Sequence, residues 1–395
     1  MFYPRRMARF GHSMKSAWAL DPEIIYLNHG TVGAPPRCVL EKQQKLRDQI
    51  ERQPSQFLLR ELAGTRFATS ADKPPLLRTA AEEVAQFLGA RGTDLVFVDN
   101  ATSGVNAVLR SMDFKEGDEI LILDLAYGAI RNALEYTARR HGAAVRTVEI
   151  RLPVPSADAV IEKTEEAIGD KTRLAILDHV TSESALILPI AEIASRCHAR
   201  GVAVLVDGAH APGAIRLDIP SLGVDWYTGN LHKWAWSPRS CGVLWTESSR
   251  QAELHHPVIS WGLDQGIAAE FDWPGTRDPT PYLAAPAGIQ FMRELGVAEV
   301  QRYNHELAYK AGGAMAAHWS TSLLGPKEMI GAMACVPLPE RIGSTREDAM
   351  RLRDTLLFEH GIEVNVHAWQ GRLRIRVSAQ IYNEMSDVER LLDAI

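Results

Sequence analysis

Short apolar runs alternate with amphipathic stretches between about Asp94 and Trp245. Seven of these runs are predicted strands, and most of them are rich in valine, isoleucine and leucine with little polar alternation, as expected for strands covered on both faces. Stretches between them, such as 130–140, 157–168 and 189–200, carry apolar residues at helical spacing. This alternation predicts an α/β domain with a mainly parallel, seven-stranded sheet and helices on both faces. The predicted strands are Leu95–Val98, Glu119–Leu123, Ala144–Ile150, Leu174–Leu177, Ala203–Val206, Asp225–Tyr227 and Gly242–Trp245.

The pattern changes after about residue 279. Residues 280–318 read as two helices separated near Gly296, and the remainder mixes short apolar strands with helices. This mixture predicts a second, smaller α+β domain. The stretches Asp72–Pro75 and Leu263–Pro281 are rich in turn-forming residues and predict loops. The expected strands are Met333–Pro337, Glu363–Val366 and Leu373–Val377, and the expected helices are Thr345–Glu359 and Ser386–Leu392.

Composition and charge narrow the class of protein. The formal net charge of −6, without long runs of one sign, gives no reason to expect a nucleic-acid partner. The chain contains no run of about 18 apolar residues, and its basic N-terminus is not followed by an apolar stretch, so we expect neither a membrane span nor a secretory signal. The four cysteines form no C-x-x-C pair, which favours reduced thiols in the cytoplasm over disulfides or a zinc site.

Candidate chemistry gathers where the predicted strands end, which is where open α/β sheets bind ligands. The segment Asp99–Gly104 follows one strand and opens a helix with small and hydroxyl residues. Free N–H groups at such a helix start bind anions, and phosphate suits them. The alternative is an ordinary N-cap, in which Thr102 or Ser103 satisfies the helix itself.

An acid and an aromatic residue stand at two other strand ends. Asp207 directly follows the apolar run Val202–Val206, so its carboxylate should be partly desolvated and should need a cationic partner, such as a protonated pyridine nitrogen. The alternative is an aspartate that caps a turn. Tyr127 follows Glu119–Leu123 and could stack on a flat heteroaromatic ligand, although an aromatic residue here is more often part of the core.

Lys233 is the least ordinary of these residues. It follows an apolar strand and is flanked by His232, Trp234 and Trp236, whereas most lysines are solvated. Apolar surroundings lower the pKa of a lysine and free its amine as a nucleophile toward carbonyls. A phosphate clamp, an acid, a lysine and an aromatic ring together predict a site for pyridoxal 5′-phosphate (PLP), held by Lys233 as a Schiff base.

The segments DGAH (207–210) and WYTGNLHKW (226–234) resemble the class V aminotransferase family, and more narrowly its isopenicillin N epimerase-like branch. The resemblance spans roughly residues 20–395. It implies a PLP-dependent transferase of fold type I (aspartate aminotransferase-like), acting as a homodimer with shared active sites. It also divides the chain into an N-terminal segment (1–40) joining the small domain and the substrate site, a large PLP-binding domain (41–279) and a small domain (280–395). Further matching segments are Tyr26–Ala34, Tyr127–Ala129, His179–Ser182, Trp273–Asp278 and Arg374–Asn383.

The resemblance assigns a role to each matching residue of the cofactor site. Lys233 would hold the cofactor and move the Cα proton, Asp207 would pair with the pyridine N–H, and Tyr127 would stack on the ring. Ser182 and His210 would contact the ring hydroxyl. Thr276 would reach the phosphate bound by the partner subunit. The remaining phosphate ligands would be Ala101, Thr102, Asn230 and His232.

On the substrate side, the resemblance implies that Arg376 holds the carboxylate of an amino acid as a bidentate clamp. Asn28, His29 and Gly30 would line the same space. Arg277 would either contact the substrate or only brace its own loop.

The resemblance favours chemistry at Cα of an amino acid, with Lys233 as general base. We expect an isopenicillin N epimerase-like reaction (epimerase or racemase). The alternative is a C–S lyase acting on a cysteine derivative, similar to hercynylcysteine sulfoxide lyase. Aminotransfer is less expected, and so is cysteine desulfuration, because no cysteine stands between Ile342 and Arg376 and Cys335 lies in a strand that reads as buried. An epimerase needs a second proton donor, for which His29 is the candidate.

Other classes of function are less well supported. A nucleotide-dependent dehydrogenase needs a G-x-G-x-x-G turn, which Asn100–Gly104 is not. A metal hydrolase would use His255 and His256, but no further ligands stand at matching spacing, so we expect no metal and interpret both histidines as surface residues. A non-catalytic relative would be expected to have lost Lys233.

Overall fold

The computed structural model describes residues 10–63 and 74–395 and contains the predicted seven-stranded sheet. Its strand order is β2-β8-β7-β6-β5-β3-β4, and neighbouring strands are parallel except β8, which runs antiparallel to both β2 and β7. The mainly parallel α/β architecture is therefore confirmed. The strands are β2 (Leu95–Val98), β3 (Glu119–Leu123), β4 (Ala144–Val148), β5 (Thr172–Asp178), β6 (Ala203–Gly208), β7 (Trp226–Asn230) and β8 (Gly242–Thr246).

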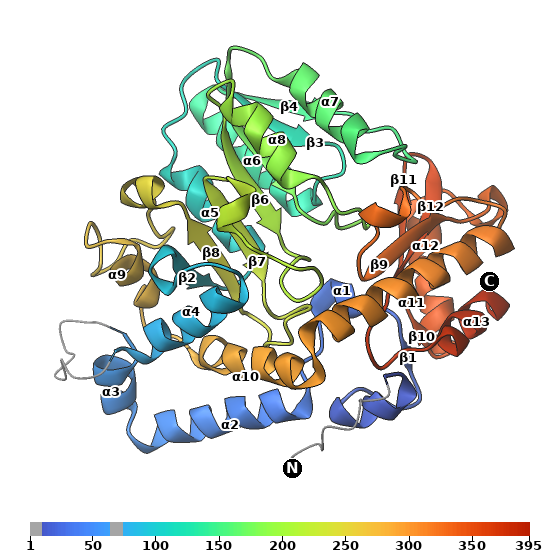
Figure 1. Cartoon of the computed structure of the whole chain (residues 1–395), viewed down its shortest axis with the longest axis horizontal. Coiled ribbons are helices and arrows are strands. Elements are labelled where there is room, and N and C mark those ends of the chain that lie inside the picture. The colour runs from blue at the N-terminus through green and yellow to red at the C-terminus, as the bar shows by residue number, and fades with distance from the viewer. Residues whose placement is uncertain (1–9, 64–73) are drawn as a thin grey trace.

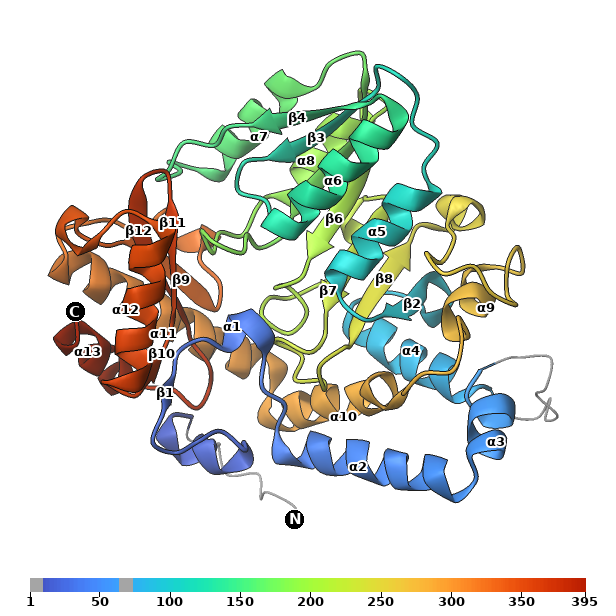
Figure 2. The same cartoon turned by 180° about the vertical axis from the view of Figure 1, so that it is seen from behind.

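Helices cover both faces of this sheet, as Figures 1 and 2 show from opposite sides. Alternate residues of β3 enter two separate apolar clusters, with Leu121 and Leu123 in one and Ile120 and Ile122 in the other. Burial on both faces explains why these strands read as continuous apolar runs. One face carries α4 (Leu76–Phe87), α7 (Ala157–Ala167) and α8 (Ile190–His198), and the other carries α5 (Ala101–Ser111) and α6 (Gly128–His141).

The C-terminal region is built on a separate antiparallel sheet with the strand order β11-β12-β9. The two helices predicted in 280–318 are found on either side of Gly296. The strand predicted at 363–366 is instead divided between two strands, because Ile362–Glu363 pairs in parallel with an N-terminal strand. The elements are α10 (Thr280–Leu295), α11 (Val297–His318), β9 (Met333–Pro337), α12 (Arg346–Phe358), β10 (Ile362–Glu363), β11 (Asn365–Trp369), β12 (Arg372–Ser378) and α13 (Met385–Asp393).

The N-terminal segment passes between these two regions. Strand β1 (Ile25–Tyr26) pairs with β10, and the one-turn helix α1 (His29–Val32) lies between the large sheet and the C-terminal sheet in Figures 1 and 2. The chain then continues through α2 (Arg37–Arg52) and α3 (Pro54–Gln56). This path brings residues of the first 40 to the ends of the large-sheet strands.

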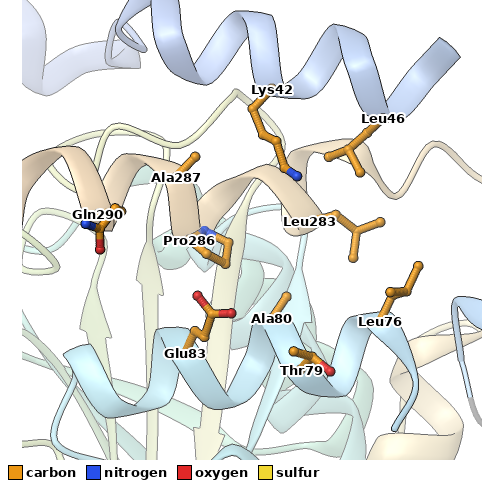
Figure 3. A pocket seen from close by; sticks show the side chains of 10 residues that line it. All are labelled: Lys42, Leu46, Leu76, Thr79, Ala80, Glu83, Leu283, Pro286, Ala287 and Gln290. Atoms are coloured by element: carbon orange, nitrogen blue, oxygen red, sulfur yellow. The ribbon is translucent and has the colours of Figure 1, made fainter. Parts of the chain in front are cut away.

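Helix α10 packs against α2 and α4, and a surface cavity of about 380 Å³ lies between the three helices (Figure 3). Aliphatic side chains such as Leu46, Leu76 and Leu283 line most of it, and Lys42 and Glu83 stand at its rim. None of its lining residues belongs to the strand ends where the candidate chemistry gathers.

Two local expectations were wrong. The stretch Leu263–Pro281 is not all loop, because residues 267–272 form α9 (Ile267–Asp272), whose Ile267 and Phe271 are buried against the sheet. The cap of α5 is neither Thr102 nor Ser103 but Asn100, whose side-chain oxygen accepts a hydrogen bond from Ser103 N at 3.0 Å. The first half of Asp72–Pro75 lies outside the described residues.

Candidate active site

Lys233 lies just beyond the end of β7 in a largely buried setting. Its Nζ atom is 3.1 Å from Nε2 of His210, and Trp234 Nε1 donates to the other ring nitrogen of His210 at 3.5 Å. Burial, followed by the charge of Arg376, lowers the pKa of Lys233 from 10.5 to about 7, although Asp207 and Asp178 oppose this shift. Lys233 therefore carries a substantial fraction of neutral, nucleophilic amine near neutral pH.

Asp207 is the penultimate residue of β6 and stands beside a second buried carboxylate. Asp178 is its cross-strand partner at the end of β5, and both are less than a tenth exposed. Burial raises the pKa of Asp207, with Ala209 N, which donates to it at 2.9 Å, and Lys233 acting in the opposite sense. Burial and then the charge of Asp207 raise the pKa of Asp178 well above its ordinary value. The pair thus calls for a proton or a cation between the strand ends.

Sequence reasoning missed Asp178, although it carries the same signal as Asp207. Each aspartate directly follows a buried apolar run, Leu174–Leu177 in one case and Ala203–Val206 in the other. Tyr227 and His179 were also not singled out. The ring of His179 is buried, and its Nδ1 lies 2.9 Å from the Tyr227 hydroxyl, next to Asp207.

The start of α5 is held against the end of β7. Asn230 Oδ1 accepts a hydrogen bond from Ala101 N at 2.8 Å, so Asn230 positions the first turn that contains Thr102. Gly104 permits this approach, because a Cβ atom there would lie 2.1 Å from Thr228 Oγ1. His232 follows β7, and its Nδ1 is 3.0 Å from the Cys241 carbonyl oxygen. Burial lowers the pKa of His232 to about 4, so the ring is neutral.

Arg376 reaches the same space from β12. It donates to the Ser182 carbonyl oxygen and, at 2.9 Å, to Thr31 Oγ1. Thr31 donates in turn to Asn28 Oδ1, and Asn28 donates to Glu363 at 2.7 Å. A chain of hydrogen bonds from β10 through the N-terminal segment therefore holds this guanidinium in place, while its Nε atom is buried without a partner among the described residues.

His29 is positioned differently from what the sequence suggested. It is fully buried, with Nε2 3.0 Å from the Lys233 carbonyl oxygen and Nδ1 2.9 Å from the Tyr382 hydroxyl. Burial lowers its pKa to about 4. The ring thus braces the Lys233 backbone and does not face an open substrate space. Gly30 lies tightly against the C-terminal sheet, since a Cβ there would lie 2.6 Å from Met333 Sδ.

Three other predicted residues lie toward the surface. Tyr127 is 46% exposed at the start of α6, and Thr276 is exposed in the loop after α9. Arg277 donates to the Phe271 carbonyl oxygen at 2.9 Å and stacks over the Tyr282 ring at 4.9 Å. These contacts favour the interpretation that Arg277 braces its own loop over the interpretation that it contacts the substrate.

The histidine pair that raised the metal-hydrolase alternative is partly buried, and not on the surface as expected. His255 Nδ1 lies 3.0 Å from Glu270 Oε1, and Glu270 also accepts from the backbone N–H groups of His256 and Asp264. His255, Asp264 and Glu270 therefore do come together, although no sequence spacing indicated it. Since Glu270 is buried and bonded to all three, it ties this loop to α9.

Cys335 is buried in β9, opposite Arg376 in the register of the sheet. Burial raises the pKa of its thiol to about 12, even though Arg374 and Arg376 act in the opposite sense. A thiol with so high a pKa is a poor nucleophile near neutral pH. This agrees with its interpretation as a core residue.

The residues present fit PLP. A buried carboxylate without an ion-pair partner among the described residues suits a protonated ring nitrogen, and it stands near a lysine with a lowered pKa. Ala101, Thr102, Asn230 and His232 would surround the phosphate, and Tyr127, Ser182 and His210 would surround the ring. Backbone N–H groups at the start of α5 provide the anion-binding end that a phosphate needs.

Comparisons with known proteins agree with this arrangement. A family model described as Aminotransferase class-V matches residues 63–391. A probable chloroplastic L-cysteine desulfhydrase of Arabidopsis thaliana is 33% identical, covering 95% of this chain and 83% of that protein. An isopenicillin N epimerase of Streptomyces clavuligerus is 35% identical and covers 95% of both chains. A cysteine desulfurase from Thermococcus onnurineus NA1 shares the fold, with a TM-score of 0.78 at 20% identity over 98% of this chain and 97% of that one.

Proposed function

The chain belongs to the class V aminotransferase family and is a PLP-dependent enzyme, as the sequence predicted, and on this premise we propose that it cleaves the C–S bond of a cysteine-derived amino acid by β-elimination. Overall, the substrate and one water would give a thiol, pyruvate and ammonia. PLP, when bound, supplies electron withdrawal from Cα. The proton leaves Cα for Nζ of Lys233, and the electron pair of the C–S bond leaves with sulfur.

The proposal depends mainly on the number of bases that face the substrate space. Elimination needs one base at Cα, and Lys233, with a pKa of about 7, is suited to that task. Epimerisation needs a second proton donor on the opposite side of Cα. His29, the candidate for that role, has both ring nitrogens engaged and a pKa of about 4. The geometry therefore supports one-base chemistry better than two-base chemistry.

Other residues of the chain would bind and orient the reactants. Arg376 would hold the substrate carboxylate, because Thr31 and Ser182 fix its guanidinium where its charge acts on Lys233. Asp207 would keep a positive charge on the cofactor ring. His210, which contacts the Lys233 amine and has a pKa held well below its ordinary range by burial, would remain neutral and orient that amine.

Epimerisation, the reaction that the sequence led us to expect first, is the second candidate. It is favoured by the match over nearly the whole chain to the Streptomyces clavuligerus isopenicillin N epimerase. For this reaction, Lys233 would remove the proton and a group outside the contacts described above would return it on the other face.

We also propose a homodimer with shared active sites. The loop before α9 exposes Val258 and Ile259 by more than half, and Thr276 is exposed farther along the same stretch. Apolar side chains gathered on one exposed segment are typical of an interface.

A reducing compartment such as the cytoplasm is supported by four unpaired cysteines. No helix in the described part of the chain is long and apolar enough to cross a membrane.

Incubation of the purified enzyme with L-cysteine, S-substituted cysteines and L-alanine in deuterated water tests the proposal. We expect pyruvate and thiol from the cysteine derivatives, and deuterium at Cα of alanine. Inverted chirality at Cα without pyruvate release would contradict elimination and identify the reaction as epimerisation. Failure of every amino acid to exchange its Cα proton would contradict both.

A further inference from the structure

One face of the small antiparallel sheet is unusually polar for a buried surface. In β12, Leu373, Ile375 and Val377 enter an apolar cluster, so Arg374 and Arg376 point to the opposite face. The register places Cys335 and Asn365 beside Arg376, and His367 beside Arg374, on this same face. Because Arg376 also touches Ser182 and Thr31, this face borders the active site.

Arg374 is buried there without the partners that a guanidinium requires. Its residue is only 7% exposed, and its Nε and Nη1 atoms are inaccessible and have no hydrogen-bond partner among the described residues. No carboxylate of the described residues lies within ion-pair distance of the Arg374 guanidinium. Trp369 stacks on the guanidinium at 4.0 Å from the ring centroid and so holds its plane. Unsatisfied buried charged donors are costly, so a ligand that brings an acceptor to them would be bound favourably.

The nearest acidic side chain of this chain does not fill that role. Glu183 acts electrostatically on both Arg374 and Arg376, but its side chain is exposed at the surface and forms no ion pair with either. The facing ring nitrogen Nε2 of His367 is likewise buried without a partner in the described structure. Burial lowers the pKa of His367 to about 3, and the charges of Arg376 and Arg374 add to this shift. The space around the two arginines is therefore strongly positive.

The two arginines occupy different positions along β12. Arg376 contacts Ser182 and Thr31, and its charge acts on Lys233, whereas Arg374 lies two residues earlier in the strand and stacks on Trp369. Residues two apart on one strand face are separated by about 7 Å. A substrate whose α-carboxylate is held by Arg376 would therefore extend its side chain toward Arg374.

We propose that Arg374 binds an acidic group at the far end of the substrate side chain, so that the enzyme selects α-amino acids bearing a second carboxylate or comparable oxyanion. This rests on the proposed function, because it takes Arg376 as the clamp for the α-carboxylate. Arg374 then acts as a specificity-determining residue. A neutral side chain of the same shape would leave its donors unsatisfied and would bind less tightly.

The test compares S-carboxymethyl-L-cysteine with S-carbamoylmethyl-L-cysteine, which differ in a terminal carboxylate and its neutral amide. We expect wild-type holoenzyme to favour the acid by about tenfold to a hundredfold in kcat/KM. R374Q should lose most of this preference, because the loss of kcat/KM should fall mainly on the acid. R374K should restore part of it. R372Q, which removes an arginine on the same strand that donates to the Leu338 carbonyl oxygen, is the matched control and should keep the preference.

A binding measurement separates recognition from turnover. Calorimetric titration of holoenzyme with 3-(carboxymethylthio)propanoate and its terminal amide, neither of which has an α-amine, should show the same preference in Kd and its loss in R374Q. A wild type that treats acid and amide alike would overturn the proposal. Equal losses for both compounds in R374Q, with no rescue by R374K, would also overturn it and assign Arg374 a purely structural role.

Failure of this inference is distinguishable from failure of the proposed function. If L-alanine exchanges its Cα proton but the acid has no advantage, only the role of Arg374 is contradicted. If no amino acid exchanges and R376Q binds the dicarboxylate as tightly as wild type does, then the proposed function fails and the inference fails with it.

Discussion

The two sides of the active site differ in whether their basic side chains find hydrogen-bond partners within the protein. On the large-sheet side, Lys233 contacts His210, and Asn230 holds the start of α5 through Ala101. On the small-sheet side, Arg374, Arg376 and His367 all retain buried atoms without a partner among the described residues. Groups that already have partners are held in place for chemistry that any substrate undergoes. Groups that lack partners depend on what binds, and they are therefore suited to choosing the substrate.

Asp207→Ala should produce the largest effect, because it removes the buried carboxylate from the large-sheet side. Loss of one member of a buried charge pair costs about 3–5 kcal/mol, so Cα–H exchange should fall by roughly 10²–10⁴-fold for every substrate. Exchange in deuterated water, followed by proton NMR, measures this, and PLP binding should persist weakly. Near-normal exchange would show that Asp207 does not keep the cofactor ring charged.

Arg376→Gln should produce the next largest effect, on the small-sheet side. A charge-assisted hydrogen bond to the substrate carboxylate is lost, which lowers kcat/KM by roughly tenfold to a hundredfold for acidic and neutral side chains alike. The visible absorbance of the bound cofactor should not change. A loss of kcat/KM confined to substrates with an acidic side chain would mean that Arg376, and not Arg374, recognises that side chain.

The pH dependence of cofactor uptake sharpens the account of Lys233. Because burial lowers its pKa from 10.5 to about 7, the neutral amine predominates above pH 7 and the protonated amine below it. The rate at which apoprotein takes up PLP should therefore rise with pH up to about 7 and then level off. Stopped-flow absorbance measures this rate. A rate that keeps rising tenfold per pH unit up to pH 10 would indicate an ordinary, solvated lysine.

Cys335→Ala should produce the smallest effect. Its thiol is buried with a pKa of about 12, so turnover should stay within about twofold of wild type, while the free energy of unfolding falls by about 1 kcal/mol. Pyruvate release and chemical denaturation measure these two quantities. A loss of sulfur release of more than tenfold would assign the thiol a catalytic role and reopen cysteine desulfuration.

The sequence predicted the large sheet well because most of its strands are buried on both faces. Apolar runs such as Leu95–Val98 then coincide with the strand itself. Helix α9 was missed because a six-residue helix among Gly and Pro residues has too few turns to show periodicity. The division between β10 and β11 was missed for another reason, since β10 owes its identity to a strand more than 300 residues away.

The same distinction applies to the site. Residues at or just beyond the end of a strand, such as Asp207 and Lys233, can be found from sequence because a parallel sheet brings strand ends together. Asp178 carried this signal and could have been found. The burial of His29 and the unsatisfied donors of Arg374 depend on packing between distant segments, which local patterns do not encode.

The central claim is that the amine of Lys233 holds the cofactor. Borohydride reduction of the purified yellow holoenzyme, followed by proteolysis and mass spectrometry, tests it most directly. We expect one pyridoxyl group, on the peptide that contains Lys233, and no label in Lys233→Ala, whereas the surface variant Lys171→Ala should be labelled like wild type. A label on another lysine, or a colourless wild type that takes up no added PLP, would contradict the account.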